Sequence, residues 1–189
     1  SNVPVVLVIG GSQGSEKINN ALLDVLPELL SSYQLIHQCG RKNLDECKNR
    51  ASIILERHPL RSRYHLYGFL NEDALRNAYR AADLAVSRAG SSDIFEIAAT
   101  GLPSILIPLK NSAQDHQREN AYAYARSGGA SVIEEENLSP HVLSSEIQKL
   151  IGDEAKRRNM KTAALSFAKV DAADKIAREI MRLALEHAQ

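Results

Sequence analysis

The sequence predicts an α/β fold, a doubly wound, Rossmann-like and mostly parallel sheet of about six strands with helices on both faces. Short apolar runs alternate with helical patterns about six times along the chain. The first run, Val5 to Ile9, is uninterrupted and rich in β-branched residues, which is typical of a parallel strand buried on both faces. Glycine-containing turns, such as Gly10 to Gly14, separate strand patterns from helical ones, as the crossover connections of such a sheet require.

In the first half of the chain, apolar runs and helical spacing define the elements. Leucine and isoleucine recur at helical spacing from residue 18 to residue 30, and Pro27 predicts a kink or a break in that helix. Gly68 closes a short strand, and Asn71 is placed to cap the next helix. We expect strands at 5–9, 33–38 and 64–67, and helices at 18–30, 43–56 and 71–82.

In the second half, turn residues mark the ends of the elements. Ser91 begins a helix that Gly101 and Pro103 stop, and the pair Gly128-Gly129 turns the chain into the last strand. We expect strands at 84–86, 104–108 and 130–133. Helices are expected at 91–100, 114–127, 139–151, 154–168 and 171–187.

Composition is that of a globular domain. The 189 residues are 44% hydrophobic and 24% charged, and equal numbers of basic and acidic residues, 23 each, leave no net charge. This balance argues against a nucleic-acid binder that relies on bulk positive charge. Cys39 and Cys47 are expected to be free thiols, as in a reducing cytoplasm, and no apolar run reaches the roughly 18 residues of a membrane span.

The chain reads as one ligand-binding domain, residues 1–168, followed by a C-terminal helix, residues 169–189. That helix carries an apolar stripe, Ile176, Ile180 and Leu183, suited to packing on a part of the protein beyond this chain.

Two strand-to-helix junctions are candidate anion sites. Gly11, Ser12, Gln13 and Gly14 let the backbone approach a ligand closely, and a helix N-terminus there offers unpaired N–H groups. The glycine spacing fits neither a dinucleotide fingerprint nor a P-loop, and a plain structural turn is the alternative. The second junction is the segment Arg88-Ala89-Gly90-Ser91-Ser92-Asp93, where Ser91 or Ser92 can cap the helix and capping alone is the alternative.

Further candidates follow other strands. Glu96, early in its helix, is suited to accept two hydrogen bonds from a ribose diol, or merely to complement the helix dipole. His116 and Gln117 open a helix and are able to read sugar hydroxyls, although an ordinary polar helix start explains them too. Phe69 and Leu70 are able to wall a base, or to pack in the core.

Three ordered segments make the chain recognisable: VLVIGGSQGS, SRAGSSDIFEIAATGLPSILIPL and DHQRENA. Together they resemble the carboxyl-terminal, donor-binding domain of the MurG family, the peptidoglycan N-acetylglucosaminyltransferases of the GT-B group, family 28. The resemblance implies an inverting hexosyltransferase that uses UDP-N-acetylglucosamine, without a protein-held metal or other cofactor. The acceptor is a lipid-linked muramyl-pentapeptide. Its site and the catalytic base belong to the family's amino-terminal domain, so this chain has no catalytic residue of its own.

The resemblance also assigns roles. Ser12 contacts the diphosphate, Phe69 and Leu70 flank the uracil, and Glu96 holds the ribose hydroxyls. The segment from Gly90 to Asp93 presents a helix N-terminus to phosphate and sugar, and His116 and Gln117 read the sugar, while Arg88 either assists the diphosphate or braces the strand end. Asp93 departs from the family, which more often has a small neutral or hydroxyl residue there.

The resemblance places the full-length enzyme in the cytoplasm, at the inner face of the bacterial plasma membrane. Membrane contact comes only through the missing half, and no nucleic acid is expected as a partner. The alternatives are another UDP-sugar enzyme of this architecture and a non-catalytic sugar-nucleotide-binding subunit completed by a partner chain.

Overall fold

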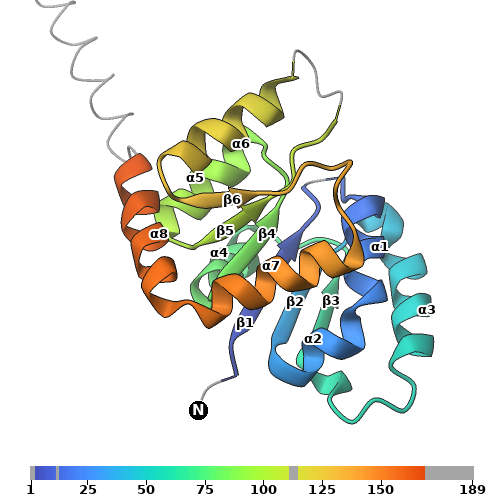
Figure 1. Ribbon diagram of the computed structural model, residues 1–189. Helices are drawn as coiled ribbons and strands as arrows, with labels where there is room; N and C mark the ends of the chain where they lie inside the picture. The colour runs from blue at the N-terminus through green and yellow to red at the C-terminus, as the bar shows by residue number, and fades with distance from the viewer. Residues whose placement is uncertain (1–2, 12, 111–114, 169–189) are drawn as a thin grey trace, which may run out of the picture.

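The computed structural model describes residues 3–11, 13–110 and 115–168, which form one sheet covered by helices (Figure 1). All five strand pairings are parallel, and the strand order is β3-β2-β1-β4-β5-β6. The strands are β1 (Val5–Ile9), β2 (Gln34–Gln38), β3 (Tyr64–Tyr67), β4 (Leu84–Ser87), β5 (Ser104–Leu106) and β6 (Ala130–Val132). The predicted doubly wound parallel sheet is confirmed.

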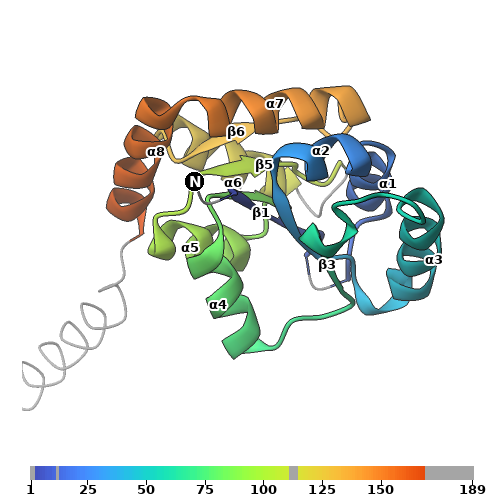
Figure 2. The same cartoon turned by 90° about the horizontal axis from the view of Figure 1, so that it is seen from below.

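Helices cover both faces of this sheet, as Figure 2 shows from below. One face packs on α1 (Glu16–Asp24), α2 (Leu26–Ser32), α3 (Leu44–Ile54) and α7 (Pro140–Gly152). The other packs on α4 (Glu72–Ala81), α5 (Ser91–Thr100), α6 (His116–Arg126) and α8 (Glu154–Phe167). Alternate residues of β1 serve the two layers, because Val6 and Val8 point into one core and Leu7 and Ile9 into the other.

Local chemistry explains several element ends. Pro27 lies in the first turn of α2, where its missing N–H costs nothing, and the predicted break separates α1 from α2. Asn71 caps α4 through its side chain, as expected, and Gly101 ends α5 in the left-handed conformation. Two short 3₁₀ helices, η1 (Arg41–Asn43) and η2 (Arg61–Arg63), were not predicted.

One detail of the sequence-based prediction is wrong, and others fall outside the described residues. Neither Ser91 nor Ser92 caps α5, because Gly90 occupies the N-cap position and no side chain bonds there. Ser12, Gln114, the domain of residues 169–189 and the helix expected at 171–187 lie outside the described residues. Within residues 3–11, 13–110 and 115–168, no helix is both long and apolar enough to cross a membrane.

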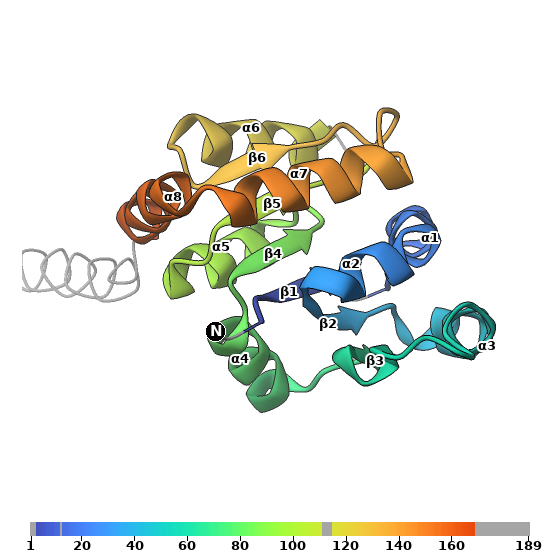
Figure 3. The same cartoon turned by 60° about the horizontal axis from the view of Figure 1, so that its bottom comes forward.

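The strand order reverses between β1 and β4, as the fan of strands in Figure 3 shows. From β1 the chain winds outward to β2 and β3, and then crosses back to build β4, β5 and β6 on the other side. At such a switch point, the loops that leave two neighbouring strands diverge to opposite faces and open a crevice. The fold therefore places its ligand crevice beyond Ile9 and Ser87, which are register partners.

Candidate functional site

The two glycine-containing loops of the sequence meet at the switch point. The turn from Gly10 to Gly14 leaves β1, the segment from Arg88 to Gly90 leaves β4, and these strands are neighbours. Between the loops lies a cavity of about 490 Å³. Its described lining is Gly10, Gly11, Gln13, Gly14, Arg88, Gly90, Ser91, Ser92, Asp93, Leu109 and Gln117.

Close packing and backbone conformation both require glycine in the first loop. Gly14 has φ of +80°, and a Cβ on it would lie 2.1 Å from the carbonyl oxygen of Cys39 at the end of β2. Gly11 has φ of +81°, but a Cβ there would make only ordinary contacts with the Arg88 and Asp93 side chains, none nearer than 3.9 Å. Gly14 thus locks the turn against the sheet, while Gly11 leaves the backbone accessible from the cavity.

The second loop presents the N-terminus of α5. Gly90 is the N-cap, and no side chain accepts from the first-turn N–H groups, the first helical backbone bond being Ile94 N–H to Gly90 C=O. The N–H groups of Ser91, Ser92 and Asp93 therefore have no partner inside the helix. Ser91 and Ser92 are exposed on the cavity, so this end of α5 offers donors and a partial positive charge to an anion.

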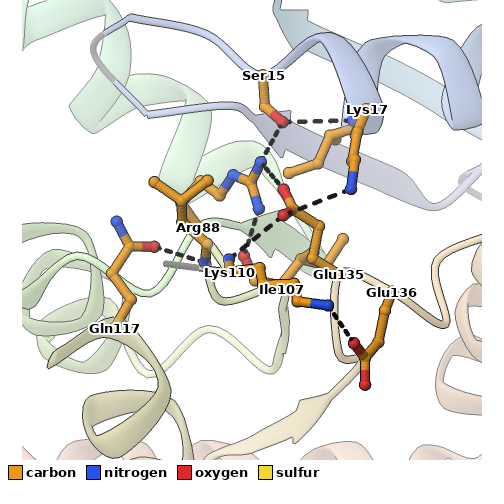
Figure 4. Close-up of polar contacts among 10 residues, drawn as sticks. Ser15, Lys17, Arg88, Ile107, Lys110, Gln117, Glu135 and Glu136 are labelled. Carbon is orange, nitrogen blue, oxygen red and sulfur yellow. Dashed lines mark hydrogen bonds and ion pairs between the residues drawn. The ribbon is translucent and has the colours of Figure 1, made fainter. Parts of the chain in front are cut away.

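Arg88 lines the cavity as a buried residue, and it bonds to residues of three other segments of the chain (Figure 4). Its guanidinium donates to Glu135 Oε1 at 2.5 Å, to Ser15 Oγ at 2.6 Å and to the Ile107 carbonyl at 3.2 Å. Ser15 is the N-cap of α1, and its Oγ also accepts from Ile18 N–H. Arg88 thereby joins the ends of β4 and β5, the start of α1 and the loop after β6, which supports the bracing role.

Glu135 completes this buried network. Its carboxylate also accepts from the Lys110 backbone N–H at 3.3 Å and lies 3.6 Å from Lys17 Nζ. Burial alone would raise the pKa of Glu135, but Arg88, the Lys110 N–H and Lys17 together lower it below its ordinary value. The carboxylate is therefore ionised at neutral pH and neutralises the Arg88 guanidinium.

A second polar cluster supports the first loop from behind. Asn19 of α1 donates to the Cys39 carbonyl at 3.0 Å, and its Oδ1 lies 3.0 Å from His37 Nε2. The other ring nitrogen of His37 lies 2.8 Å from the hydroxyl of Tyr64. Burial lowers the pKa of His37 to about 3, so the imidazole is neutral at physiological pH. This histidine serves the structure of the loop rather than a ligand.

Glu96 and Asp93 lie one turn apart on α5. Asp93 lines the cavity, whereas Glu96 is exposed beyond it and accepts a hydrogen bond from the Tyr79 hydroxyl at 3.2 Å. Residues at this spacing share a helix face, about one 5.4 Å turn apart. Glu96 therefore extends the cavity face along the helix, where a group attached to a phosphate bound at the N-terminus would lie.

The proposed base-binding pair separates into an exposed and a buried residue. Phe69 is 46% exposed, and the Arg41 guanidinium lies over its ring, 4.4 Å from the centroid. Leu70 is buried in the core, and its N–H donates to Gln38 Oε1 at 2.8 Å. Phe69 thus offers an accessible aromatic surface, while the N–H of Leu70 is already committed to the fold.

The start of α6 reaches the cavity from the β5 side. Gln117 lines the cavity, and its Oε1 accepts from Leu109 N–H at 3.0 Å, which orders the chain after β5. His116 is exposed, and Asp115 precedes it with φ of +57°. Within residues 3–11, 13–110 and 115–168, no three His, Cys, Asp or Glu side chains are grouped to hold a metal ion.

The structure brings together Gly11, Gln13, Gly14, Arg88, Gly90, Ser91, Ser92, Asp93 and Gln117 around one cavity. Phe69, Leu70, Glu96 and His116 are not part of its lining, and Ser12 lies outside the described residues. Sequence reasoning missed Glu135 and Ser15. Glu135 follows the last parallel strand, which was a usable signal, but it stands in a run of three glutamates that looks like a solvated loop.

A comparison with protein-family models identifies the family. Residues 5–176 match the glycosyltransferase family 28 C-terminal domain. The chain belongs to this family. It is a glycosyltransferase-family domain, and its crevice lies at the switch point of the sheet, where open α/β sheets generally bind their ligands.

Two relatives of this family 28 domain share one name. The chain is 37% identical to a Salinibacter ruber protein over 97% of its own length, and 36% identical to one from Geobacter metallireducens over 93%. Both are named UDP-N-acetylglucosamine--N-acetylmuramyl-(pentapeptide) pyrophosphoryl-undecaprenol N-acetylglucosamine transferase. The chain spans 48% and 47% of these relatives, about half their length.

Solved structures share the fold of the family 28 domain at lower identity. Acinetobacter baumannii MurG matches with a TM-score of 0.75 and 24% identity, covering 96% of this chain and 50% of that one. A putative UDP-N-acetylglucosamine 2-epimerase from Listeria monocytogenes matches with a TM-score of 0.72 and 18% identity, covering 97% and 46%. These likenesses establish that the chain has half of a GT-B fold, and they show the fold alone.

Proposed function

We propose that this domain binds UDP-N-acetylglucosamine as the sugar donor of a peptidoglycan N-acetylglucosaminyltransferase. The observation that carries the proposal is the meeting of the glycine turn after β1 and the uncapped N-terminus of α5 at one switch point, with a cavity between them. A nucleotide sugar carries two linked phosphates, and the open N–H groups at the start of α5, facing the backbone of a glycine turn, suit a diphosphate. The names of the relatives at 36–37% identity supply the donor and the reaction.

In this proposal the diphosphate lies between Gly11 and the N-terminus of α5. The ribose diol then reaches Glu96, one turn further along α5, and the uracil stacks near Phe69. Gln117 and His116 face the N-acetylglucosamine from α6. The lining of the cavity supports the placement of the diphosphate and, for Gln117 alone, that of the sugar, and the shared helix face of Asp93 and Glu96 supports the placement of the ribose.

Catalysis by this half of the enzyme is electrostatic. As the glycosidic bond to the anomeric carbon breaks, negative charge develops on the departing UDP. Preorganised N–H donors and the α5 dipole stabilise that charge without reorganising, and we propose that no protein-held metal or other cofactor is needed. Arg88 acts indirectly in this scheme, because its guanidinium is tied to Glu135, Ser15 and Ile107.

The rest of the enzyme supplies the acceptor side. We propose that a further domain binds undecaprenyl-pyrophosphoryl-N-acetylmuramyl-pentapeptide and provides the base that deprotonates its hydroxyl. Because that acceptor is lipid-linked, the complete enzyme works at the cytoplasmic face of the bacterial plasma membrane. The relatives are about twice the length of this chain, and this difference in length supports the proposal of a further domain.

Calorimetric titration with UDP-N-acetylglucosamine tests the proposal. We expect saturable binding at one site without transfer to acceptor by this chain. Loss of the charged hydrogen bonds that Glu96 accepts from the ribose, worth about 1.5–3 kcal/mol, predicts roughly tenfold to hundredfold weaker binding by Glu96→Ala. Glu154→Gln, which removes an exposed carboxylate from the first turn of α8, serves as the control and should bind like the wild type. Absence of saturable binding by the wild type would refute the proposal.

A further inference from the structure

Asp93 places a carboxylate where the proposed diphosphate must lie. A Cβ on Gly90 would be 3.2 Å from Asp93 Oδ2, and one on Gly11 would be 4.0 Å from the same atom. The carboxylate therefore stands between the two loops, inside the cavity that both of them line. An anion that uses the backbone of both loops cannot avoid this side chain.

The carboxylate is not neutralised by its surroundings. Among the described residues, no hydrogen bond or ion pair reaches Asp93, and α5 begins at Gly90 without a side-chain cap. Arg88 is the nearest cation by sequence, and its side-chain stem passes Gly11, 3.9 Å from a Cβ placed there. Its guanidinium, however, is committed to Glu135. An ionised Asp93 would thus oppose a diphosphate with little compensation.

Other titratable groups around Asp93 do not relieve this conflict. Glu96 lies one turn along α5, and Tyr79 of α4 donates to Glu96. His116 begins α6 next to Gln117 of the cavity lining, and the glycine turn contributes no titratable side chain in its described part. Burial, with a smaller contribution from Glu96, raises the pKa of Asp93 to about 6. An approaching anion raises the pKa of a carboxyl in this setting further, so the carboxylate readily takes up a proton from solvent.

We propose that Asp93 binds the donor in its protonated form and donates its carboxyl O–H to a diphosphate oxygen, so that donor binding takes up one proton. The inference rests on the proposed function and adds a role for Asp93 in it. The proton comes from solvent and returns to it when UDP leaves. Asp93 then favours an anionic ligand, because a nearby anion raises the pKa of the carboxyl and keeps the donated proton in place.

The consequence is a donor affinity that depends on pH. Above pH 6 the free carboxyl is increasingly ionised and must be reprotonated on binding, which weakens affinity by up to tenfold per pH unit. We expect UDP-N-acetylglucosamine to bind at least tenfold more weakly at pH 8 than at pH 5.5. The sugar nucleotide is the right probe because its diphosphate diester keeps its charge in this range, whereas the terminal phosphate of UDP ionises near pH 6.

Proton uptake is measurable directly by calorimetry at pH 7.5 in two buffers of different ionisation enthalpy. We expect the wild type and the control Glu154→Gln to take up about one proton per donor bound. Asp93→Asn, which is isosteric and cannot ionise, should take up none, show a flat pH profile from 5.5 to 8 and bind more tightly than wild type at pH 8. Asp93→Thr should show the same flat profile, which guards against a folding defect in the first variant.

Three results would overturn the inference, and they distinguish its failure from that of the proposed function. Saturable wild-type binding without proton uptake, or uptake retained by both Asp93 variants, removes the role of Asp93 and leaves the proposed function intact. No saturable donor binding by the wild type at any pH overturns the proposed function and this inference together.

Discussion

Replacing Glu135 with alanine should destabilise the domain strongly, because it isolates a buried guanidinium. The Arg88 and Glu135 side chains are 10% and 6% exposed, and their closest atoms are 2.5 Å apart. After the change, the Ser15 hydroxyl and the Ile107 carbonyl are the partners that Arg88 retains among the described residues. Removing one member of a buried pair typically costs about 3–5 kcal/mol. That is a large part of the roughly 5–15 kcal/mol that stabilises a typical domain.

The free energy of unfolding in urea at pH 7, followed by circular dichroism, measures this loss. Glu136→Ala is the matched control, because Glu136 is the next residue and its Oε2 pairs with Lys110 Nζ at 2.8 Å, but both side chains are about 60% exposed. We expect Glu136→Ala to have the same free energy of unfolding as the wild type. A double-mutant cycle with Arg88→Met should give a double variant more stable than the sum of the single changes predicts, by at least about 1 kcal/mol, because no unpaired charge then remains buried.

Equal stability of Glu135→Ala and Glu136→Ala would refute this reasoning. It would mean that the Arg88–Glu135 pair is solvated and does not hold the loops together. A strictly additive double-mutant cycle would lead to the same conclusion, since coupled groups must show an interaction free energy.

Two further predictions concern the support of the glycine turn. The folded-state pKa of His37 lies below the usual value of 6.5, at about 3. The unfolded state therefore binds the extra proton, and stability should fall with acidification below pH 6.5 by up to about 1.4 kcal/mol per pH unit. His37→Gln should lose that contribution, so the difference between the two urea-unfolding profiles isolates it, and parallel profiles would contradict a buried neutral imidazole. Gly14→Ala should lose at least about 1–3 kcal/mol and weaken donor binding, because its Cβ would collide with the Cys39 carbonyl at a positive φ. Gly152→Ala, where nothing lies within 4 Å, is the control for the same thermal-unfolding and donor-titration measurements, and equal behaviour of the two variants would argue against a locked turn.

The sequence predicted the elements well, because local patterns determine them. Uninterrupted apolar runs such as Val5 to Ile9 can only be buried strands in this context, and Pro27 and Asn71 act through their own backbone chemistry. Strand order could not be predicted in this way, because the sequence of a strand does not specify which strand pairs with it. That β1 lies beside β4, which brings the two loops together, emerges only from the structure.

The details of the site depended on contacts that no local pattern contains. Arg88 and Glu135 are 47 residues apart and meet because both follow parallel strands at the same edge. The serines expected to cap α5 do not, since Gly90 takes the N-cap position and leaves the N–H groups open to a ligand. Leu70 was predicted either to wall a base or to pack in the core; it is buried in the core, and its N–H is held by Gln38, which is remote in sequence.

The most direct test is a titration of the ¹⁵N-labelled chain with UDP, followed by NMR. We predict that the amide signals of Gly11 and Gly14 in the first loop, and of Ser91 and Ser92 in the second, shift together and fit one dissociation constant. Shifts confined to one of the loops, or centred on the opposite edge of the sheet, would contradict the proposal that both loops bind the same diphosphate.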